Sequence, residues 1–234
     1  MAPTVLITGA SAGSGKATAI LFASKGYDVV MLAPEPERLA AAAAQVQREG
    51  SSAVAIGGDV GDIQQVRAIV QKALDACGNI DVLVNNAGIW LTGAIEHTTS
   101  EDWQQLMNTN FWGCVNTIQE ILPHFLQRKT GTIVNVGSIG GKMPLPDMTA
   151  YCASKYAVTG LTQTLRLELA PQGIHVCAVH LGLINSDFLE RALLRDRDEP
   201  AVELRRQLMS QMLKSDWVNQ PEDIARAIWD AVKN

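Results

Sequence analysis

The sequence contains few cysteines, and they follow no pattern that would bind a metal. Cys77, Cys114, Cys152 and Cys177 are scattered without a C-x-x-C pair, and their spacing to the histidines does not suggest a zinc site. We therefore expect no metal centre. Scattered thiols are typical of a reducing compartment, which indicates a cytoplasmic protein.

The chain also lacks a long apolar run and an excess of positive charge. No apolar stretch approaches the roughly 18 residues of a membrane span, and the first residues have neither the basic nor the apolar region of a signal peptide. A formal net charge of -5 offers no basic stripe for phosphate groups, so nucleic acid and anionic membrane are not expected partners. A small-molecule partner fits better.

Repeats and flexible linkers are absent too, so we interpret residues 1–234 as one domain. Short β-branched runs alternate with helical patterns along this domain. The predicted strands are Thr4–Thr8, Asp28–Leu32, Ala53–Gly57, Ile80–Val84, Thr132–Val136 and Ile174–Val179. The predicted helices are Gly15–Lys25, Pro36–Glu49, Asp62–Cys77, about Ser100–Gln127, about Ala150–Ala170, and a last one from Pro221 to the chain end.

This alternation predicts an α/β fold. Strands separated by helices cannot form hairpins, and their apolar cores are continuous, as in Val-Leu-Ile at 5–7, which indicates burial on both faces. We expect a single doubly wound, Rossmann-type parallel sheet with helices on both faces. The segment from about Asn185 to Trp217 breaks the pattern. It follows the last strand, where such folds bind ligands, and we interpret it as the substrate-binding loop.

A glycine-rich turn follows the first predicted strand. Thr8-Gly9-Ala10-Ser11-Ala12-Gly13-Ser14-Gly15 joins that strand to a helix. Glycines let backbone N–H groups approach a pyrophosphate, and the positive end of the helix favours the same group. The setting favours nucleotide binding; a glycine-rich turn that binds nothing is the alternative.

Three further residues stand where chemistry is expected. Ser138 follows the fifth predicted strand, and Tyr151 and Lys155 open the next helix, one turn apart on one face. A free tyrosine has a pKa near ~10, so its use as a base at neutral pH requires a stabilised anion. We expect the ammonium group of Lys155 to lower the pKa of Tyr151.

Together these motifs resemble the short-chain dehydrogenase/reductase family along nearly the whole chain. The loop matches T-G-x-x-x-G-x-G, residues 85–88 match N-N-A-G, and Ser138, Tyr151 and Lys155 match S…Y-x-x-x-K. The resemblance implies an NAD(P)-dependent oxidoreductase that moves a hydride between a nicotinamide cofactor and a ketone, aldehyde or secondary alcohol. The alternative is an inactive dinucleotide-binding regulator or scaffold, against which the intact motifs argue.

The resemblance also implies roles for individual residues. Tyr151 exchanges the proton with the substrate oxygen, Ser138 donates a hydrogen bond to that oxygen, and Lys155 holds the nicotinamide ribose. Asn110, the fourth catalytic residue, helps to hold a water that links the lysine to solvent. The expected cofactor contacts are Gly9, Ser11, Gly13, Ser14, Gly15, Asp59, Val60, Asn86, Ala87, Gly88, Tyr151, Lys155, Gly182, Ile184 and Ser186.

The usual determinants of cofactor choice are missing. Members that prefer NAD place an Asp at the position of Ala33, and NADP users often place an Arg at that of Pro34 or a basic residue at that of Ala12. Without a carboxylate at position 33 a 2′-phosphate is not repelled, and Ser11, Lys16 or Arg38 could contact it, although Glu35 adds negative charge. We expect NADP(H) to be preferred, with NAD(H) as the alternative.

The substrate is expected to be lipophilic, and the protein to be a homodimer. The residues expected to line the substrate pocket are Trp90, Leu91, Met143, Leu145, Leu183, Phe188 and Leu189. His180 lies near this region and is interpreted as a packing residue. The helices around 100–127 and 150–170 carry extra apolar residues and usually pair across a two-fold axis in the family; a tetramer is the alternative. Leu181 replaces a proline usual in the family.

Overall fold

The computed structural model describes residues 2–215 and 218–233, and six parallel strands form its main sheet. The order across the sheet is β3-β2-β1-β4-β6-β7. These strands are β1 (Thr4–Thr8), β2 (Asp28–Ala33), β3 (Ala53–Gly57), β4 (Val82–Asn85), β6 (Gly131–Ser138) and β7 (Ile174–Leu181). The strand order changes direction between β1 and β4. A ligand is therefore expected to bind in the crevice beyond the carboxyl ends of these two strands. The prediction of a doubly wound parallel sheet is confirmed.

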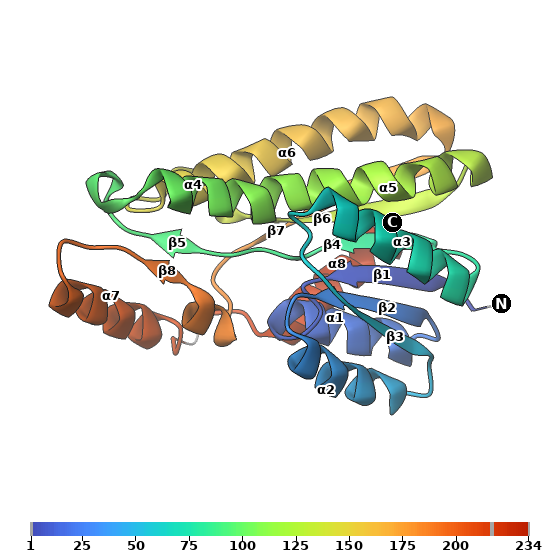
Figure 1. Cartoon of the computed structure of the whole chain (residues 1–234), viewed down its shortest axis with the longest axis horizontal. Coiled ribbons are helices and arrows are strands. Elements are labelled where there is room, and N and C mark those ends of the chain that lie inside the picture. Colours follow the sequence, from blue (N-terminus) through green and yellow to red (C-terminus); the bar gives the residue numbers. More distant parts are fainter. Residues whose placement is uncertain (1, 216–217, 234) are drawn as a thin grey trace.

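Helices cover both faces of this sheet (Figure 1). The eight α-helices among the described residues are α1 (Gly13–Ser24), α2 (Pro36–Gln47), α3 (Ile63–Cys77), α4 (Ser100–Met107), α5 (Gly113–Arg128), α6 (Thr149–Leu169), α7 (Glu199–Met212) and α8 (Pro221–Lys233). Val5 and Ile7 pack with α1, α2 and α8, whereas Leu6 packs with α3 and α5. Adjacent residues of one strand thus enter opposite cores, which explains the continuously apolar strands. Within the described chain, no helix has the length and apolarity needed to cross a membrane.

The predicted helix over about 100–127 is interrupted by a different helical turn. Residues Asn108–Trp112 form a π-helical turn between α4 and α5. Such turns insert an extra residue into the helix and rotate the side chains that follow, and they occur often at functional sites. No hydrophobic pattern marks this turn, so the sequence prediction missed it.

The segment after β7 contains structure that was predicted only as a loop. It holds a turn at Asp187–Arg191, the short strand β8 (Leu193–Leu194) and helix α7. Strand β8 pairs in parallel with β5 (Leu91–Thr92). Figure 1 shows β5, β8 and α7 side by side, beyond the carboxyl ends of the main strands. This small layer therefore adjoins the region where the site residues gather.

Candidate active site

The glycine-rich loop is held in a conformation that only glycine adopts easily. Gly9 has φ +65° and Gly13 has φ +50°, both in the left-handed region. Gly15 has a different role, because a Cβ there would lie 2.2 Å from the Gly9 carbonyl oxygen and 2.5 Å from Asn86 Nδ2. Gly15 is buried and does not line the cleft. It lets α1 begin directly against the loop.

Asn86 fastens this loop to the end of β4. Its Nδ2 donates to the carbonyl oxygens of Thr8 (3.0 Å) and Gly9 (3.3 Å), and its Oδ1 accepts from Ser14 Oγ at 2.8 Å. Thr8 Oγ1 in turn accepts from the backbone N–H groups of Asn86 and Ala87, at 3.0 and 2.9 Å. The two loops that were expected to hold a dinucleotide therefore form one rigid unit.

A buried polar chain behind these loops was not predicted. Asn85 Nδ2 donates to Asn135 Oδ1 at 2.9 Å, and Thr117 Oγ1 donates to Asn85 Oδ1 at 2.6 Å. Asn135 Nδ2 donates onward to Thr162 Oγ1 at 2.9 Å. These hydrogen bonds connect β4 and β6 to α5 and α6. A signal was present, because an asparagine inside an apolar strand needs buried partners.

One cleft of about 870 Å³ contains both the loop and the predicted catalytic end. The predicted cofactor contacts that line it are Gly9, Ser11, Gly13, Ser14, Asp59, Val60, Asn86, Ala87, Gly88, Tyr151, Lys155, Gly182, Ile184 and Ser186. Val60 is held by a hydrogen bond from Asn116 Nδ2 to its carbonyl oxygen (2.9 Å). A glycine cradle, the start of α1 and a cleft of this size are the features that a dinucleotide requires.

The adenosine end of the cleft contains an unexpected contact. Ser11 Oγ donates to Glu35 Oε2 at 3.1 Å, and Glu35 lines the cleft beside Ala33. Lys16 and Arg38 line an adjoining pocket of about 250 Å³, which shares Ser11, Ala12 and Gly13 with the cleft. Both signs of charge therefore flank the place where a 2′-hydroxyl or 2′-phosphate is expected.

At the other end of the cleft, Ser138, Tyr151 and Lys155 come together. Ser138 ends β6, and its Oγ accepts a hydrogen bond from the backbone N–H of Gly140 at 3.1 Å. Tyr151 is 9% exposed and Lys155 is 6% exposed. The Lys155 ammonium nitrogen lies 5.9 Å from the centre of the tyrosine ring and donates to the Val136 carbonyl oxygen at 3.2 Å.

The expectation of a lowered tyrosine pKa is wrong for this structure. Burial raises the pKa of Tyr151 to about 12, and the hydrogen bond with Ser138 lowers it only in part. Burial also lowers the pKa of Lys155. Desolvation disfavours both charged forms, so the spacing of four does not by itself lower the pKa of the phenol. At neutral pH the phenol therefore carries its proton.

Asn110 lies behind these groups in the π-helical turn. Its Oδ1 accepts from the backbone N–H of Ile89 at 2.8 Å, and its Nδ2 donates to the Ile89 carbonyl oxygen and to Ser154 Oγ, both at 3.0 Å. A Cβ added to Gly88 would lie 3.3 Å from Asn110 Oδ1 and 3.5 Å from Lys155 Nζ. Gly88 therefore lies against both groups, and Asn110, which is 1% exposed, does not line the cleft itself.

The loop after β7 forms part of the wall of the cleft. Ile184 pairs with Asn219, and the backbone N–H of Asn185 donates to the Asn219 carbonyl oxygen at 2.9 Å. His180 Nδ1 lies 3.3 Å from the Ser138 carbonyl oxygen. Its ring covers Gly137, where a Cβ would approach within 2.5 Å. Burial lowers the pKa of His180, as expected for a packing residue.

The substrate walls are partly those that the sequence indicated. Trp90, Leu145, Leu183 and Leu189 line the cleft. Leu91 does not, because it is buried in β5, and Met143 points to solvent with 47% exposure. The side chain of Phe188 lies outside the described residues. Lining residues that the sequence prediction missed include Ile139, Met148, Met212 and Leu213.

Comparisons with known proteins agree with this geometry. The family model of the short-chain dehydrogenases matches residues 3–196. The chain is 34% identical over 229 residues to the 3-oxoacyl-(acyl-carrier-protein) reductase FabG of Staphylococcus aureus, covering 97% of this chain and 89% of that protein. It is 38% identical over 186 residues to the 3-ketodihydrosphingosine reductase of Bacteroides thetaiotaomicron, covering 80% of this chain and 65% of that protein.

Solved structures give the same result. A short-chain dehydrogenase/reductase from Burkholderia phymatum in complex with NAD superposes with a TM-score of 0.90 at 26% identity, covering 99% of this chain and 86% of that one. A short-chain dehydrogenase from Sphingobium yanoikuyae in complex with NADPH gives a TM-score of 0.83 at 32% identity, covering 99% and 84%. The chain therefore belongs to the short-chain dehydrogenase/reductase family, and it is an oxidoreductase that uses a nicotinamide cofactor.

Proposed function

We propose that this protein moves a hydride between NADP(H) and the carbonyl or alcohol carbon of a lipophilic substrate, with Tyr151 as the proton donor and acceptor. The observation that carries the proposal is the position of Tyr151. Tyr151 and Ser138 both line the cleft that also contains the glycine-rich loop, and the interaction with Ser138 partly offsets the effect of burial on the pKa of the phenol. Two hydroxyl groups at one point can bind one substrate oxygen.

The residues suit reduction of a carbonyl directly. A bound nicotinamide supplies the hydride. Ser138 and Tyr151 then stabilise the negative charge that develops on the carbonyl oxygen. The phenol is protonated at neutral pH, because burial holds its pKa at about 12, so Tyr151 gives its proton to that oxygen. Oxidation of an alcohol uses the same steps in reverse and requires the phenolate, which the Lys155 ammonium stabilises.

The remaining site residues position the cofactor in this proposal. Gly9, Gly13 and Ser14 hold the pyrophosphate through the loop and the start of α1, and Asp59 and Val60 hold the adenine. Lys155 donates to the ribose hydroxyls. Asn110 keeps the Ile89 backbone in place and holds a water beside Lys155.

Cofactor preference follows from the adenosine end. Ala33 leaves space for a 2′-phosphate, and Lys16 and Arg38 line the adjoining pocket with positive charge. Glu35 opposes them, although its carboxylate accepts a hydrogen bond from Ser11. We therefore propose a modest preference for NADP(H) over NAD(H).

The substrate, the assembly and the compartment are proposed from other features of the chain. Trp90, Leu145, Met148 and Leu189 make the substrate wall apolar, and the two curated relatives are named for substrates with an oxo or keto group at position 3. Apolar side chains exposed on the α5–α6 side, with Trp112 at 49%, suit a homodimer. Four free thiols suit the cytoplasm.

The test is a panel of ketones, aldehydes and secondary alcohols, assayed with each form of both cofactors by the absorbance of the reduced ring. Tyr151→Phe should lower kcat by ~10²–10⁴-fold while the cofactor Kd changes little. Tyr156→Phe is the matched control, because this tyrosine is on the same helix but 46% exposed, and it should keep wild-type turnover. Wild-type turnover that survives in Tyr151→Phe would refute the assignment, and a cofactor-binding protein without turnover on any substrate would support the scaffold alternative.

A further inference from the structure

Helix α7 carries a cation, Arg205, on the face that packs against apolar residues. Val202 and Met209 pack against the cluster that contains Trp90 and Tyr151, and Met212 lines the cleft. Arg205 is three residues after Val202 and four before Met209, so it lies on this inner face. Its side chain is only 19% exposed. Leu204 and Leu208, by contrast, are both 57% exposed.

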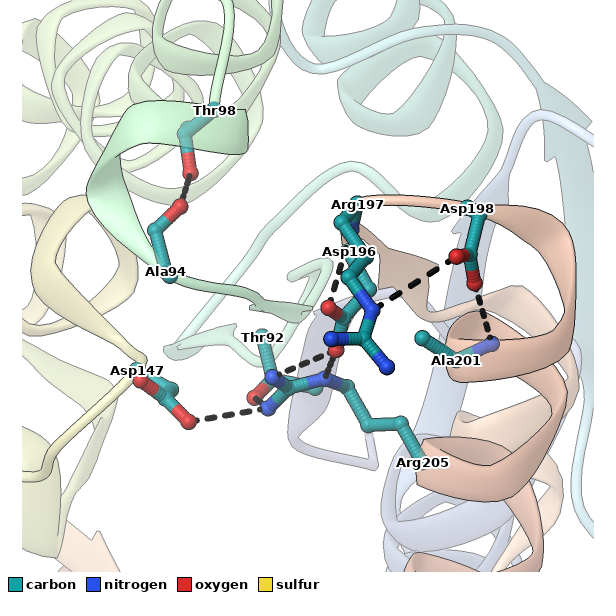
Figure 2. Close-up of polar contacts among 9 residues, drawn as sticks. All are labelled: Thr92, Ala94, Thr98, Asp147, Asp196, Arg197, Asp198, Ala201 and Arg205. Carbon is teal, nitrogen blue, oxygen red and sulfur yellow. Dashed lines mark hydrogen bonds and ion pairs between the residues drawn. The ribbon is translucent and has the colours of Figure 1, made fainter.

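Arg205 is held there by three other segments (Figure 2). Its Nη1 donates to Asp147 Oδ2 at 3.0 Å and to Thr92 Oγ1 at 3.4 Å. Its Nε and Nη2 donate to Asp196 Oδ2 at 3.1 and 2.9 Å. Asp147 precedes α6, Thr92 is in β5 and Asp196 lies between β8 and α7. We call these four residues the Arg205 cluster.

Asp147 connects the cluster to the wall of the active site. It has φ +60°, which is rare for a residue other than glycine, and its carbonyl oxygen accepts from the Gly93 N–H at 2.7 Å. Leu145 and Met148, on either side of it, line the cleft. Met148 directly precedes α6, which carries Tyr151. Arg205 thus joins α7, which carries Met212, to the segment that carries Leu145 and Met148.

A second arginine holds the layer formed by β5, β8 and α7 through a separate contact. Arg195 donates to both carboxylate oxygens of Asp102, at 2.9 and 2.7 Å. Asp102 is 3% exposed, and its Oδ2 also accepts from the backbone N–H of Thr99, the N-cap of α4. Because this pair holds the end of β8, loss of Arg205 should release α7 while β8 stays in place.

We propose that Arg205 is a positioning residue for the substrate: it fixes the inner face of α7 so that Met212 and Leu213 complete the cleft opposite Leu145 and Met148. Arg205 does not line the cleft, so it acts through these side chains. The substrate part of this inference rests on the proposed function. The helix position does not, and it can be measured without turnover.

The first test compares Arg205→Met with Arg206→Met. Arg206 is the next residue on the helix, and its Nε lies 3.8 Å from Glu203 Oε2 at the surface. In hydrogen–deuterium exchange, Arg205→Met should increase exchange of the α7 amides at least tenfold and leave those of α6 unchanged. Arg206→Met should match the wild type. Equal exchange of α7 in both variants would overturn the proposal, even for a protein without detectable turnover.

The second test separates positioning from simple stability. If only a fraction of the molecules keeps the cleft complete, the apparent KM rises by the inverse of that fraction, whereas the proton-transfer groups are untouched. We expect Arg205→Met to raise the substrate KM about tenfold, with kcat and cofactor Kd within about twofold, and Arg205→Lys to fall between. A fall in kcat as large as the rise in KM would refute the positioning role.

Asp147→Asn gives a third variant that keeps the backbone conformation, because asparagine tolerates positive φ. It should raise the substrate KM less than Arg205→Met, since Asp196 still holds the arginine. The double variant should be no worse than Arg205→Met alone. Strictly additive effects would show that the two side chains do not act together and would overturn the proposed role of the Asp147 contact.

Discussion

Gly15→Ala tests whether Gly15 is required for packing rather than for cofactor contact. A Cβ at this position would lie 2.2 Å from the Gly9 carbonyl oxygen, where ordinary contacts are 3.4–4 Å. The obstacle is a backbone carbonyl, and the backbone of Gly9 has φ +65° and lies against Ala87, because a Cβ added to Gly9 would contact that residue. The Gly9 carbonyl therefore cannot rotate away. The loop must therefore move as a unit by about 1 Å in a close-packed interior.

The magnitude follows from two opposing effects. Alanine gains about 1 kcal/mol over glycine inside a helix, and overpacking costs typically about 1–3 kcal/mol. Because the obstacle is backbone, we expect the cost to lie at or above the upper end, and the net loss in unfolding free energy to be about 2 kcal/mol. For a chain of this size that lowers Tm by about 4–8 °C.

Gly160→Ala is the matched control. Gly160 also lies inside a helix, but nothing approaches its virtual Cβ within 4 Å, so the substitution should raise unfolding free energy by about 0.5–1 kcal/mol. Both variants are measured by urea unfolding and calorimetry, with mass checked by light scattering because α6 belongs to the proposed dimer interface. Cofactor affinity should fall more than about tenfold in Gly15→Ala only, since the loop moves. A Gly15→Ala protein as stable as Gly160→Ala, with unchanged cofactor Kd, would refute this reasoning.

Two further predictions concern pH and cofactor choice. Because the pKa of Tyr151 is raised to about 12, kcat/KM for alcohol oxidation should rise about tenfold per pH unit above neutrality as phenolate accumulates, while carbonyl reduction stays flat until the phenol loses its proton. A pH–rate profile of both directions checks this, and a plateau in oxidation below pH ~10 would contradict the raised pKa. Ala33→Asp should shift the ratio of NADPH to NADH affinity towards NADH by at least about tenfold, because the carboxylate repels a 2′-phosphate, and Glu35→Gln should shift it the other way; calorimetric Kd values that move together for both cofactors would argue against charge as the cause.

The main sheet could be predicted because most residues of its central strands are apolar and buried. The expected bounds of β1 and β3 match those of the structure, although β3, at the edge of the sheet, is only partly buried. β6 and β7 extend further than expected, since they pair with each other from Gly131 and Ile174 to Ser138 and Leu181. The extra pairs are Gly131 with Ile174, Gly137 with His180 and Ser138 with Leu181, and the glycines among them carry no strand pattern.

Helix α7 and the β5–β8 pair could not be predicted in the same way. Two-residue strands are too short for any periodicity, and none of the described residues of α7 is fully buried. The helix has leucines outside and an arginine inside, so hydrophobic periodicity would assign its faces wrongly. Only the positions of Asp147 and Asp196 explain this, and both are set by tertiary structure.

The pair of Tyr151 and Lys155 shows the same limit at the chemical centre. Spacing along a helix determines that the two side chains share a face, whereas the pKa of each depends on how much water surrounds it. Tyr151 belongs to the same buried cluster as Trp90 and Leu194, which are far from it in sequence. That packing makes the charged forms unfavourable, and it reverses the expected shift. Since the packing includes β8, whose position depends on Arg195 and Asp102, the acid strength of the phenol is linked to the layer that also shapes the substrate cleft.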